Sequence, residues 1–377
     1  MSSVLLPFEL VDNVVGMTSN NNDNATLRAC ALVSQTWRDA TRPYIFRKIK
    51  IADEPLLAAL EALVTVDSTV GLLVRELTVQ PRTQQEHTPS SWLSRFPTLI
   101  PSYLTRLQTI QFIDLFEFGE YCNESFFREY SKFTSVERLI FHNCSLDLHL
   151  LYSYTCALPN VRHLQVGSTL PLPSMLSEPP PQLHSPRLSS IKLNLGQAYP
   201  MALEEILVWA LASPSKESLR SLSVSTRIVE STAVGNFIRE IGGSLQHLDL
   251  HLAQSFGSPI EYDFIKTDIS LTGCTALCSL SVHDSNPTLP AFVAFLSEIS
   301  SPHLRKLSLW VTSDNPDPGS LPDFRLLVEQ LDSQHLRCLE EICFIYQGPL
   351  RGALVLEKLQ KDLHNVDTRG ILRLVMA

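Results

Sequence analysis

A short pattern of hydrophobic positions recurs through most of this chain. It consists of an apolar residue, two variable residues, a second apolar residue, one variable residue and a third apolar residue, as in Leu245–Leu250 and Leu304–Leu309. Alternation of apolar and variable residues is typical of a β-strand with one buried face, so each copy predicts a short strand. The ten copies begin at Val74, Leu107, Val136, Val161, Leu188, Leu219, Leu245, Leu277, Leu304 and Leu339.

The stretches between these copies have the periodicity of amphipathic helices. Their apolar residues recur at three- and four-residue spacing in residues 55–63, 125–130, 201–210, 233–241, 291–299 and 323–331. The starts of successive copies lie 25 to 35 residues apart, with a mean of about 29. This period is near the upper end of the range of leucine-rich repeats. We therefore expect an α/β leucine-rich-repeat solenoid with a parallel sheet inside and helices outside.

The repeat pattern also sets the expected domain boundaries. We expect the solenoid, of about ten repeats, to span residues 52–353, and the amphipathic segment that follows to form a C-terminal cap over residues 354–377. The proline-rich stretches 171–186 and 314–322 predict irregular loops, because proline removes a backbone donor and fixes φ. Residues 92–107 are expected to be partly irregular.

The first part of the chain, residues 5–51, does not fit the repeat. Its apolar spacing predicts a short helix over residues 5–15 and a second helix over residues 26–38, interrupted near Ser34. A polar segment from residue 17 to residue 24 separates the two helices. We expect a small all-α module in front of the solenoid.

Three short motifs in this segment point to a known family. They are Leu6-Pro-Phe-Glu-Leu10, Leu32-Val-Ser-Gln-Thr-Trp-Arg38 and Pro43-Tyr-Ile-Phe46. The segment resembles the F-box, whose signature is Leu-Pro-x-Glu-Leu, Leu-Val-Ser-x-x-Trp-Arg and Pro-x-x-Phe in this order. With the repeats behind it, the chain resembles F-box proteins with C-terminal leucine-rich repeats of the fungal type. The polar segment 17–24 departs from that family, where the first helix usually ends in apolar residues.

The resemblance implies a function. In that family the module docks on a Skp-family adaptor, which joins it to a cullin that carries a RING subunit. The chain would then be the substrate-recognition subunit of a cullin-RING (SCF-type) ubiquitin ligase, with its inner wall binding an unknown target protein. The implied adaptor-binding residues are Leu6, Pro7, Leu10, Leu32 and Val33, with Trp37 holding the helices together at the edge of the contact.

Elementary packing agrees with a docking role for the module. Fewer than fifty residues bury little surface alone, and apolar residues in excess of a small core indicate that a partner covers them. The alternative is a leucine-rich-repeat scaffold without any ligase role, in which residues 1–51 only cap the first repeat.

The predicted inner wall carries one distinctive group of side chains. Alternate strand residues share a face, which places His247, Asp249 and His251 on one strand, His283 on the next and Trp310 on the third. Histidine and aromatic side chains bury area while keeping hydrogen-bonding capacity, so we expect this group to bind the target protein. A second interpretation of this group is that His251 and His283 share a metal ion. A third is that Asp249 raises the pKa of a histidine and makes the surface sensitive to pH.

Composition narrows the remaining function classes. The formal charge of -9 and the scattered basic residues argue against nucleic acid, and no apolar run approaches the ~20 residues that cross a bilayer. The eight cysteines lack zinc-ligand spacing, and Cys144 stands where these repeats place a residue that satisfies the turn after the strand. Nucleophile and phosphate-loop motifs are missing. We expect an intracellular binding protein, in the cytoplasm, the nucleus or both, without enzyme activity, metal or cofactor.

Overall fold

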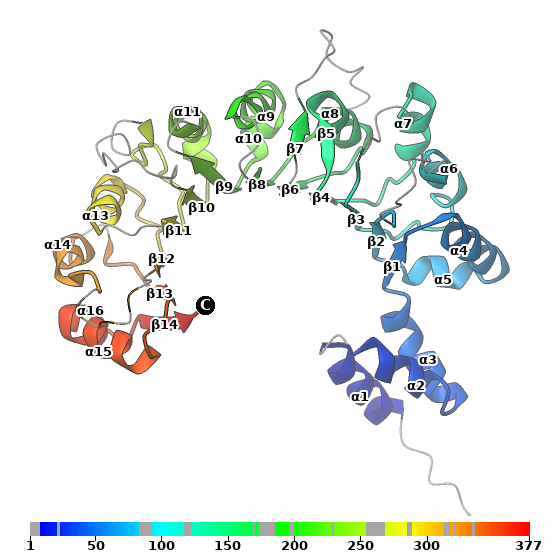
Figure 1. Cartoon of the computed structure of the whole chain (residues 1–377), viewed down its shortest axis with the longest axis horizontal. Helices are drawn as coiled ribbons and strands as arrows, with labels where there is room; N and C mark the ends of the chain where they lie inside the picture. The colour runs from blue at the N-terminus through cyan, green and yellow to red at the C-terminus, as the bar shows by residue number, and fades with distance from the viewer. Residues whose placement is uncertain are drawn as a thin grey trace, which may run out of the picture. The chain divides into compact units, whose positions relative to one another are not determined.

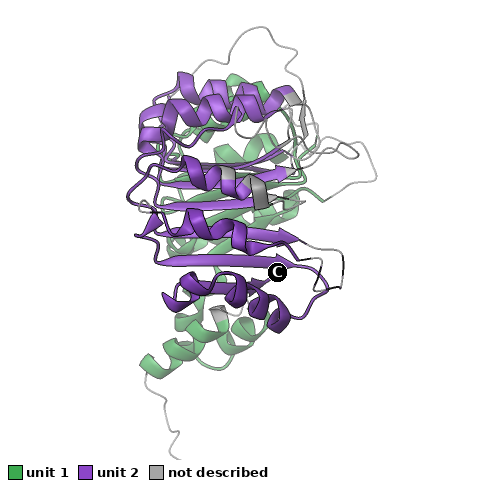
Figure 2. Cartoon of the chain, turned by 90° about the vertical axis from the view of Figure 1, so that its left-hand side faces the viewer, with its two compact units in different colours: residues 1–161, 174–184 green, residues 162–173, 185–377 purple. Residues whose placement is uncertain are grey.

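The chain divides into two compact units, which are considered one at a time. The first comprises residues 1–161 and 174–184, and the second residues 162–173 and 185–377 (Figure 2). The computed structural model describes residues 8–20, 23–82, 92–116, 122–168, 170–172, 185–195, 200–227, 230–253, 268–284, 289–312, 315, 317, 319, 321–333 and 336–377.

In the first unit, parallel strands alternate with helices. Four strands pair in chain order, and the helices lie on one side of them (Figure 1). The four strands are β1 (Lys48–Ile51), β2 (Glu76–Val79), β3 (Thr109–Ile113) and β4 (Arg138–His142), and the short β5 (Ser145–Asp147) lies outside their sheet. The helices of these repeats are α4 (Glu54–Val66), α5 (Ser68–Leu73), α6 (Trp92–Leu99), α7 (Glu124–Tyr130) and α8 (Leu148–Ala157).

The second unit continues the same alternation. Its main strands pair in the order β6-β8-β9-β10-β11-β12-β13-β14, all parallel. The strands are β6 (His163–Gly167), β7 (Leu170–Leu172), β8 (Ser190–Asn194), β9 (Ser221–Arg227), β10 (His247–Ala253), β11 (Ser279–Asp284), β12 (Lys306–Thr312), β13 (Glu341–Gln347) and β14 (Leu372–Met376). The helices are α9 (Pro200–Ala212), α10 (Ser215–Ser218), α11 (Ser231–Ile241), η3 (Gly242–Ser244), α13 (Leu289–Glu298), η5 (Phe324–Leu327), α14 (Val328–Leu331), α15 (Gly352–Asp362) and α16 (His364–Thr368).

All ten predicted strands are present, and each begins two residues after the start of its sequence pattern. The three apolar positions of a copy are core residues, as shown by Leu245, Leu248 and Leu250, which are at most 2% exposed. The alternating residues point to the opposite face, away from the helices, which we call the inner wall. The α/β leucine-rich-repeat solenoid predicted from the sequence is therefore confirmed.

Neighbouring repeats are joined by a recurring set of hydrogen bonds. The carbonyl of Arg220 accepts from the backbone N–H groups of Gln246 (2.8 Å) and His247 (2.9 Å). The Ser244 hydroxyl, directly before a repeat pattern, donates to the carbonyl of Leu219 at 2.9 Å. Such a hydroxyl satisfies a backbone oxygen that would otherwise lose its partner at the edge of the strand.

Cys144 has the structural role predicted for it. Its thiol is buried and donates to the carbonyls of Phe112 (3.5 Å) and His142 (3.4 Å) at the end of the strand. Burial raises the pKa of this thiol to about 11. The cysteine therefore serves the turn as a hydrogen-bond donor and stays protonated at neutral pH.

The structure differs from the sequence prediction in three segments. The predicted helix 323–331 is divided into η5 and α14, and α8 was not predicted. Residues 92–107 agree with the prediction of a partly irregular segment, because only α6 (Trp92–Leu99) is helical there. The predicted cap 354–377 contains a further strand, β14, which pairs in parallel with β13. The predicted boundaries at residues 51 and 353 do not coincide with the division into two units, and they stay a prediction. No helix among the described residues is long and apolar enough to span a bilayer.

Aromatic rings fill the core of the first unit. Phe112 on β3 stacks on Phe141 of β4 at 5.3 Å between ring centroids and lies 5.0 Å from the ring of Tyr154 on α8. Phe96 and Tyr130 add edge contacts from α6 and α7. All five rings are fully buried, so this cluster joins three repeats through packing alone.

The hydroxyl of Tyr130 destabilises this core. It is buried and has no hydrogen-bond partner among the described residues, and burial raises the pKa of the phenol. Because an unsatisfied buried hydroxyl costs free energy, Tyr130→Phe is expected to stabilise the protein by about 1 kcal/mol. A thermal melt would show a transition a few degrees higher, and a clearly lower transition would contradict this assignment.

Candidate functional site

The segment before the repeats folds as a three-helix module within the first unit. Its helices are α1 (Phe8–Asn20), α2 (Asn24–Ala31) and α3 (Gln35–Ile45). The Asp23 carboxylate caps α2, and the Ser34 hydroxyl caps α3 by accepting from the N–H of Trp37 at 3.4 Å. The predicted interruption at Ser34 is confirmed. The first helix, by contrast, runs on past Val15 to Asn20, so residues 17–20 of the polar segment are helical.

The module has a small core. Val11 and Val15 of α1 pack with Leu27 of α2 and Ala40 of α3, and all four side chains are buried. Trp37 is half-buried against this cluster. Its contacts are with the core of the module itself, and its role at the edge of an adaptor contact stays a prediction.

Most of the module's remaining apolar residues are exposed. Leu32 and Val33, in the turn between α2 and α3, are 84% and 68% exposed. On α1, Leu10 (51%), Val14 (47%) and Met17 (67%) follow each other at helical spacing and share one face. Among the predicted adaptor-binding residues, Leu10, Leu32 and Val33 are therefore accessible. Leu6 and Pro7 lie outside the described residues.

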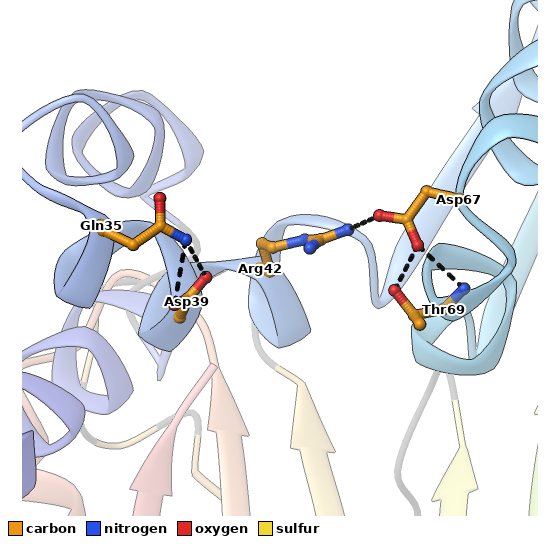
Figure 3. A network of polar contacts seen from close by, with 5 residues as sticks. All are labelled: Gln35, Asp39, Arg42, Asp67 and Thr69. Atoms are coloured by element: carbon orange, nitrogen blue, oxygen red, sulfur yellow. Dashed lines mark hydrogen bonds and ion pairs between the residues drawn. The ribbon is translucent and has the colours of Figure 1, made fainter.

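Side-chain and backbone contacts tie this module to the first repeat. Arg42 of α3 forms an ion pair with Asp67, which lies between α4 and α5 (Figure 3). Asp67 also accepts from the hydroxyl and backbone N–H of Thr69, and the hydroxyl bond, followed by the bond from Arg42, lowers the pKa of Asp67. The carbonyl of Arg47 accepts from the N–H of Glu76 at 3.0 Å.

The inner wall of the second unit brings the predicted histidine and tryptophan residues together. His251, His283 and Trp310 are direct register partners on β10, β11 and β12. The rings of His283 and Trp310 are stacked, with 4.5 Å between centroids and 13° between planes. Nδ1 of His251 lies 3.0 Å from Nδ1 of His283, and its Nε2 lies 3.1 Å from a carboxylate oxygen of Asp249. His247 is exposed on the same strand face.

Hydrogen bonds hold the carboxylate of this group in its ionised form. Burial alone would raise the pKa of Asp249, but the bonds from His251 and Ser223 outweigh it, and the pKa is lowered. The Ser223 hydroxyl donates at 2.9 Å from the neighbouring strand β9. Ser223 was not predicted to belong to this group, although its position as the register partner of Asp249 follows from the repeat pattern.

One interpretation of the sequence was that Asp249 raises a histidine pKa, and at His283 this effect is one of three. Asp249 acts to raise the pKa of His283, but burial and the neighbouring His251 outweigh it, and the net shift is downward. No group of three or more His, Cys, Asp or Glu residues is arranged to hold a metal ion in the described part of the chain. The cluster therefore presents a hydrogen-bonded, partly apolar surface.

The apolar character of this surface extends beyond Trp310. Ile345 on β13 is the register partner of Trp310, and Val375 on β14 is the partner of Ile345. Val375 is 47% exposed. Val375 was not predicted to lie on this surface, because β14 was not expected to be a strand.

Comparisons with known proteins give only remote likenesses. No family model and no curated protein matches the chain. Among solved structures, the complex of Rad7 and Elc1 from yeast is similar, with 13% identity over 91% of this chain and 87% of that chain and a TM-score of 0.39. An internalin from Listeria monocytogenes is 13% identical over 80% of this chain and 69% of that chain, with a TM-score of 0.32. Likenesses this remote do not decide a function.

Proposed function

We propose that this protein is the substrate-recognition subunit of a cullin-RING (SCF-type) ubiquitin ligase. The helical module docks on a Skp-family adaptor and through it on a cullin, and the inner wall of the solenoid binds a target protein. The observation that carries the proposal is the exposure of Leu10, Leu32 and Val33. These residues occupy the positions of the F-box signature that resemblance assigns to the adaptor contact.

The physical argument for docking concerns the free energy of exposed apolar surface. The module buries four apolar side chains in its core, whereas five of its large apolar residues are exposed to water. Clustered apolar exposure of this kind marks contact sites, since water is displaced when a partner covers it. Leu32 and Val33 add nothing to the module's own core, so their value lies in an intermolecular contact.

The target side of the proposal rests on the inner-wall cluster. Trp310, Ile345 and Val375 offer apolar area, and His251 with Asp249 offers hydrogen-bonding groups beside it. A mixed surface of this kind suits a protein or peptide target. The chain itself supplies no reacting group: it raises the effective concentration of the target near the ubiquitin-transfer machinery.

The second candidate is a leucine-rich-repeat scaffold that binds a partner without any ligase role. The contacts of Arg42 and Arg47 with the first repeat favour it, because a cap must cover the end of the repeat array. The two candidates make different demands on the helical module. A cap stabilises the repeats, whereas a docking module serves the adaptor.

Removal of residues 1–45 separates these candidates. The shortened chain keeps β1 and the Arg47 carbonyl, so the sheet edge stays intact. The receptor proposal predicts a folded solenoid, with a melting temperature within a few degrees of the full chain, that no longer binds a purified Skp-family adaptor. Aggregation or loss of cooperative melting would support the cap.

Arg42→Ala in the full chain is the matched control for this deletion. It removes the ion pair to Asp67 but leaves Leu32 and Val33 in place. Adaptor binding by this variant is expected to equal that of the unchanged protein. Loss of binding here would mean that the module needs the repeats to hold its docking conformation.

A further inference from the structure

The contact between His251 and His283 is the most unusual polar contact on the inner wall. Two imidazole Nδ1 atoms lie 3.0 Å apart, a hydrogen-bond distance, across the neighbouring strands β10 and β11. The other nitrogen of His251 is held by Asp249 at 3.1 Å, and the ring of His283 is held by its stack on Trp310. Neither ring is free to turn without losing one of these contacts.

The number of protons on the two imidazoles determines whether the hydrogen bond between them can form. A hydrogen bond between two Nδ1 atoms needs one N–H and one bare nitrogen. The neutral pair satisfies this when His283 donates to His251, and a pair with one added proton satisfies it as well. A pair with two added protons places two N–H groups face to face, so the contact has to open.

We propose that the His251–His283 pair is a proton-operated switch of the inner wall. Closed, it carries at most one positive charge; uptake of a second proton opens the pair and moves His283 off Trp310. The effect on target binding rests on the proposed function, because it assumes that the target contacts this surface. The opening itself does not depend on that function.

Among the described residues, few charged side chains lie near the pair. On β9 the register partner of His251 is the uncharged Ser225, and β10 supplies Asp249 and, farther along, His247. On β12 the nearest basic side chain is Lys306, four residues from Trp310 and paired with Glu341 at 3.5 Å. Asp249 therefore stabilises the first positive charge, and it is the only carboxylate among the side chains that the structure describes on β9 to β12.

The direction in which the pKa of His283 is shifted agrees with this switch. Burial, followed by repulsion from His251, lowers its pKa below 6.5. As pH falls below 6.5 the unfolded chain takes up this proton first, so the free energy of unfolding decreases until pH reaches the lowered pKa of the folded protein. Asp249, whose pKa is also lowered, stays ionised through this window.

Tryptophan fluorescence of the full-length protein tests the switch. The emission of Trp310, obtained by subtracting the signal of a Trp310→Phe variant, is followed from about pH 8 to about pH 5. We expect a transition with its midpoint below 6.5, because a protonated imidazole that leaves the indole ring changes its emission. His283→Gln is expected to abolish the transition.

Coupling between the two rings gives the decisive readout. His251→Gln removes the neighbouring charge, so the midpoint of the transition should rise toward 6.5. His247→Gln, on the same strand face but outside the pair, should leave the midpoint unchanged.

Three results would overturn the switch. They are a transition that survives in His283→Gln, a midpoint that does not move in His251→Gln, and the absence of any transition in the unchanged protein. The titration uses the protein alone, whereas the proposed function is tested by adaptor binding at neutral pH. The failure of one is therefore distinguishable from the failure of the other.

Discussion

Exchanging Leu32 and Val33 together for aspartate is expected to abolish binding of a Skp-family adaptor while the chain stays folded. Both side chains are more than two-thirds exposed, so the exchange removes no core packing. In the complex, two carboxylates would have to be buried without partners in an apolar contact. Central contacts of this kind are each worth about 2 kcal/mol, or about 4 kcal/mol for the two, so the dissociation constant should rise by roughly 1,000-fold.

Calorimetric titration with a purified Skp-family adaptor measures this effect, and a thermal melt checks the fold. Val66→Asp is the matched control, since Val66 is 88% exposed on α4, outside the helical module. It makes a similar apolar-to-acidic exchange and should leave the affinity unchanged. If the double variant bound within about twofold of the unchanged protein, the adaptor would not use this turn.

Phe112→Ala is expected to produce the largest loss of stability, about 3–5 kcal/mol. Phe112 is fully buried and contacts the rings of Phe141, Tyr154 and Phe96, so its removal leaves a cavity bounded by rings that cannot collapse into it. Repeats are stabilised by their neighbours, so the damage should be concentrated around β3 and β4.

Hydrogen exchange followed by mass spectrometry locates that damage. Amides of β3 and β4 should lose protection, while amides of β12 and β13 in the second unit keep theirs. Phe116→Ala is the control: Phe116 is 49% exposed, and its removal should change the stability by no more than about 0.5 kcal/mol. Equal effects of the two exchanges would show that the aromatic cluster does not hold the first unit together.

The strands of this fold were predictable because one periodic signal defines them. Every copy places three apolar residues in the core, and the strand begins at the same position of each copy. Helix α8 was not predictable in this way. It is buried on nearly all sides, with Leu148, Leu151 and Cys156 all inside, so no polar stripe marks its period.

The candidate sites were predictable as positions but not as contacts. His251, His283 and Trp310 occupy the same position in three successive copies of the repeat, so they were predicted to lie side by side. The strand register confirms this arrangement. The stacking of His283 on Trp310 and the direct contact of the two imidazoles depend on side-chain rotamers, which periodicity does not contain. The lowered pKa of His283 was not predictable either, because its largest cause is the burial of the ring, which is known only from the packed structure.

Our proposal is that the exposed turn of the helical module, Leu32 and Val33, joins this chain to a ubiquitin ligase. Its most direct test is affinity purification of the full chain from cells, beside the Leu32→Asp, Val33→Asp variant, with quantitative mass spectrometry of the bound proteins. The account predicts that a Skp-family adaptor and a cullin are enriched with the unchanged protein and fall by about tenfold or more with the variant. Recovery of neither protein with the unchanged, folded chain would contradict the account.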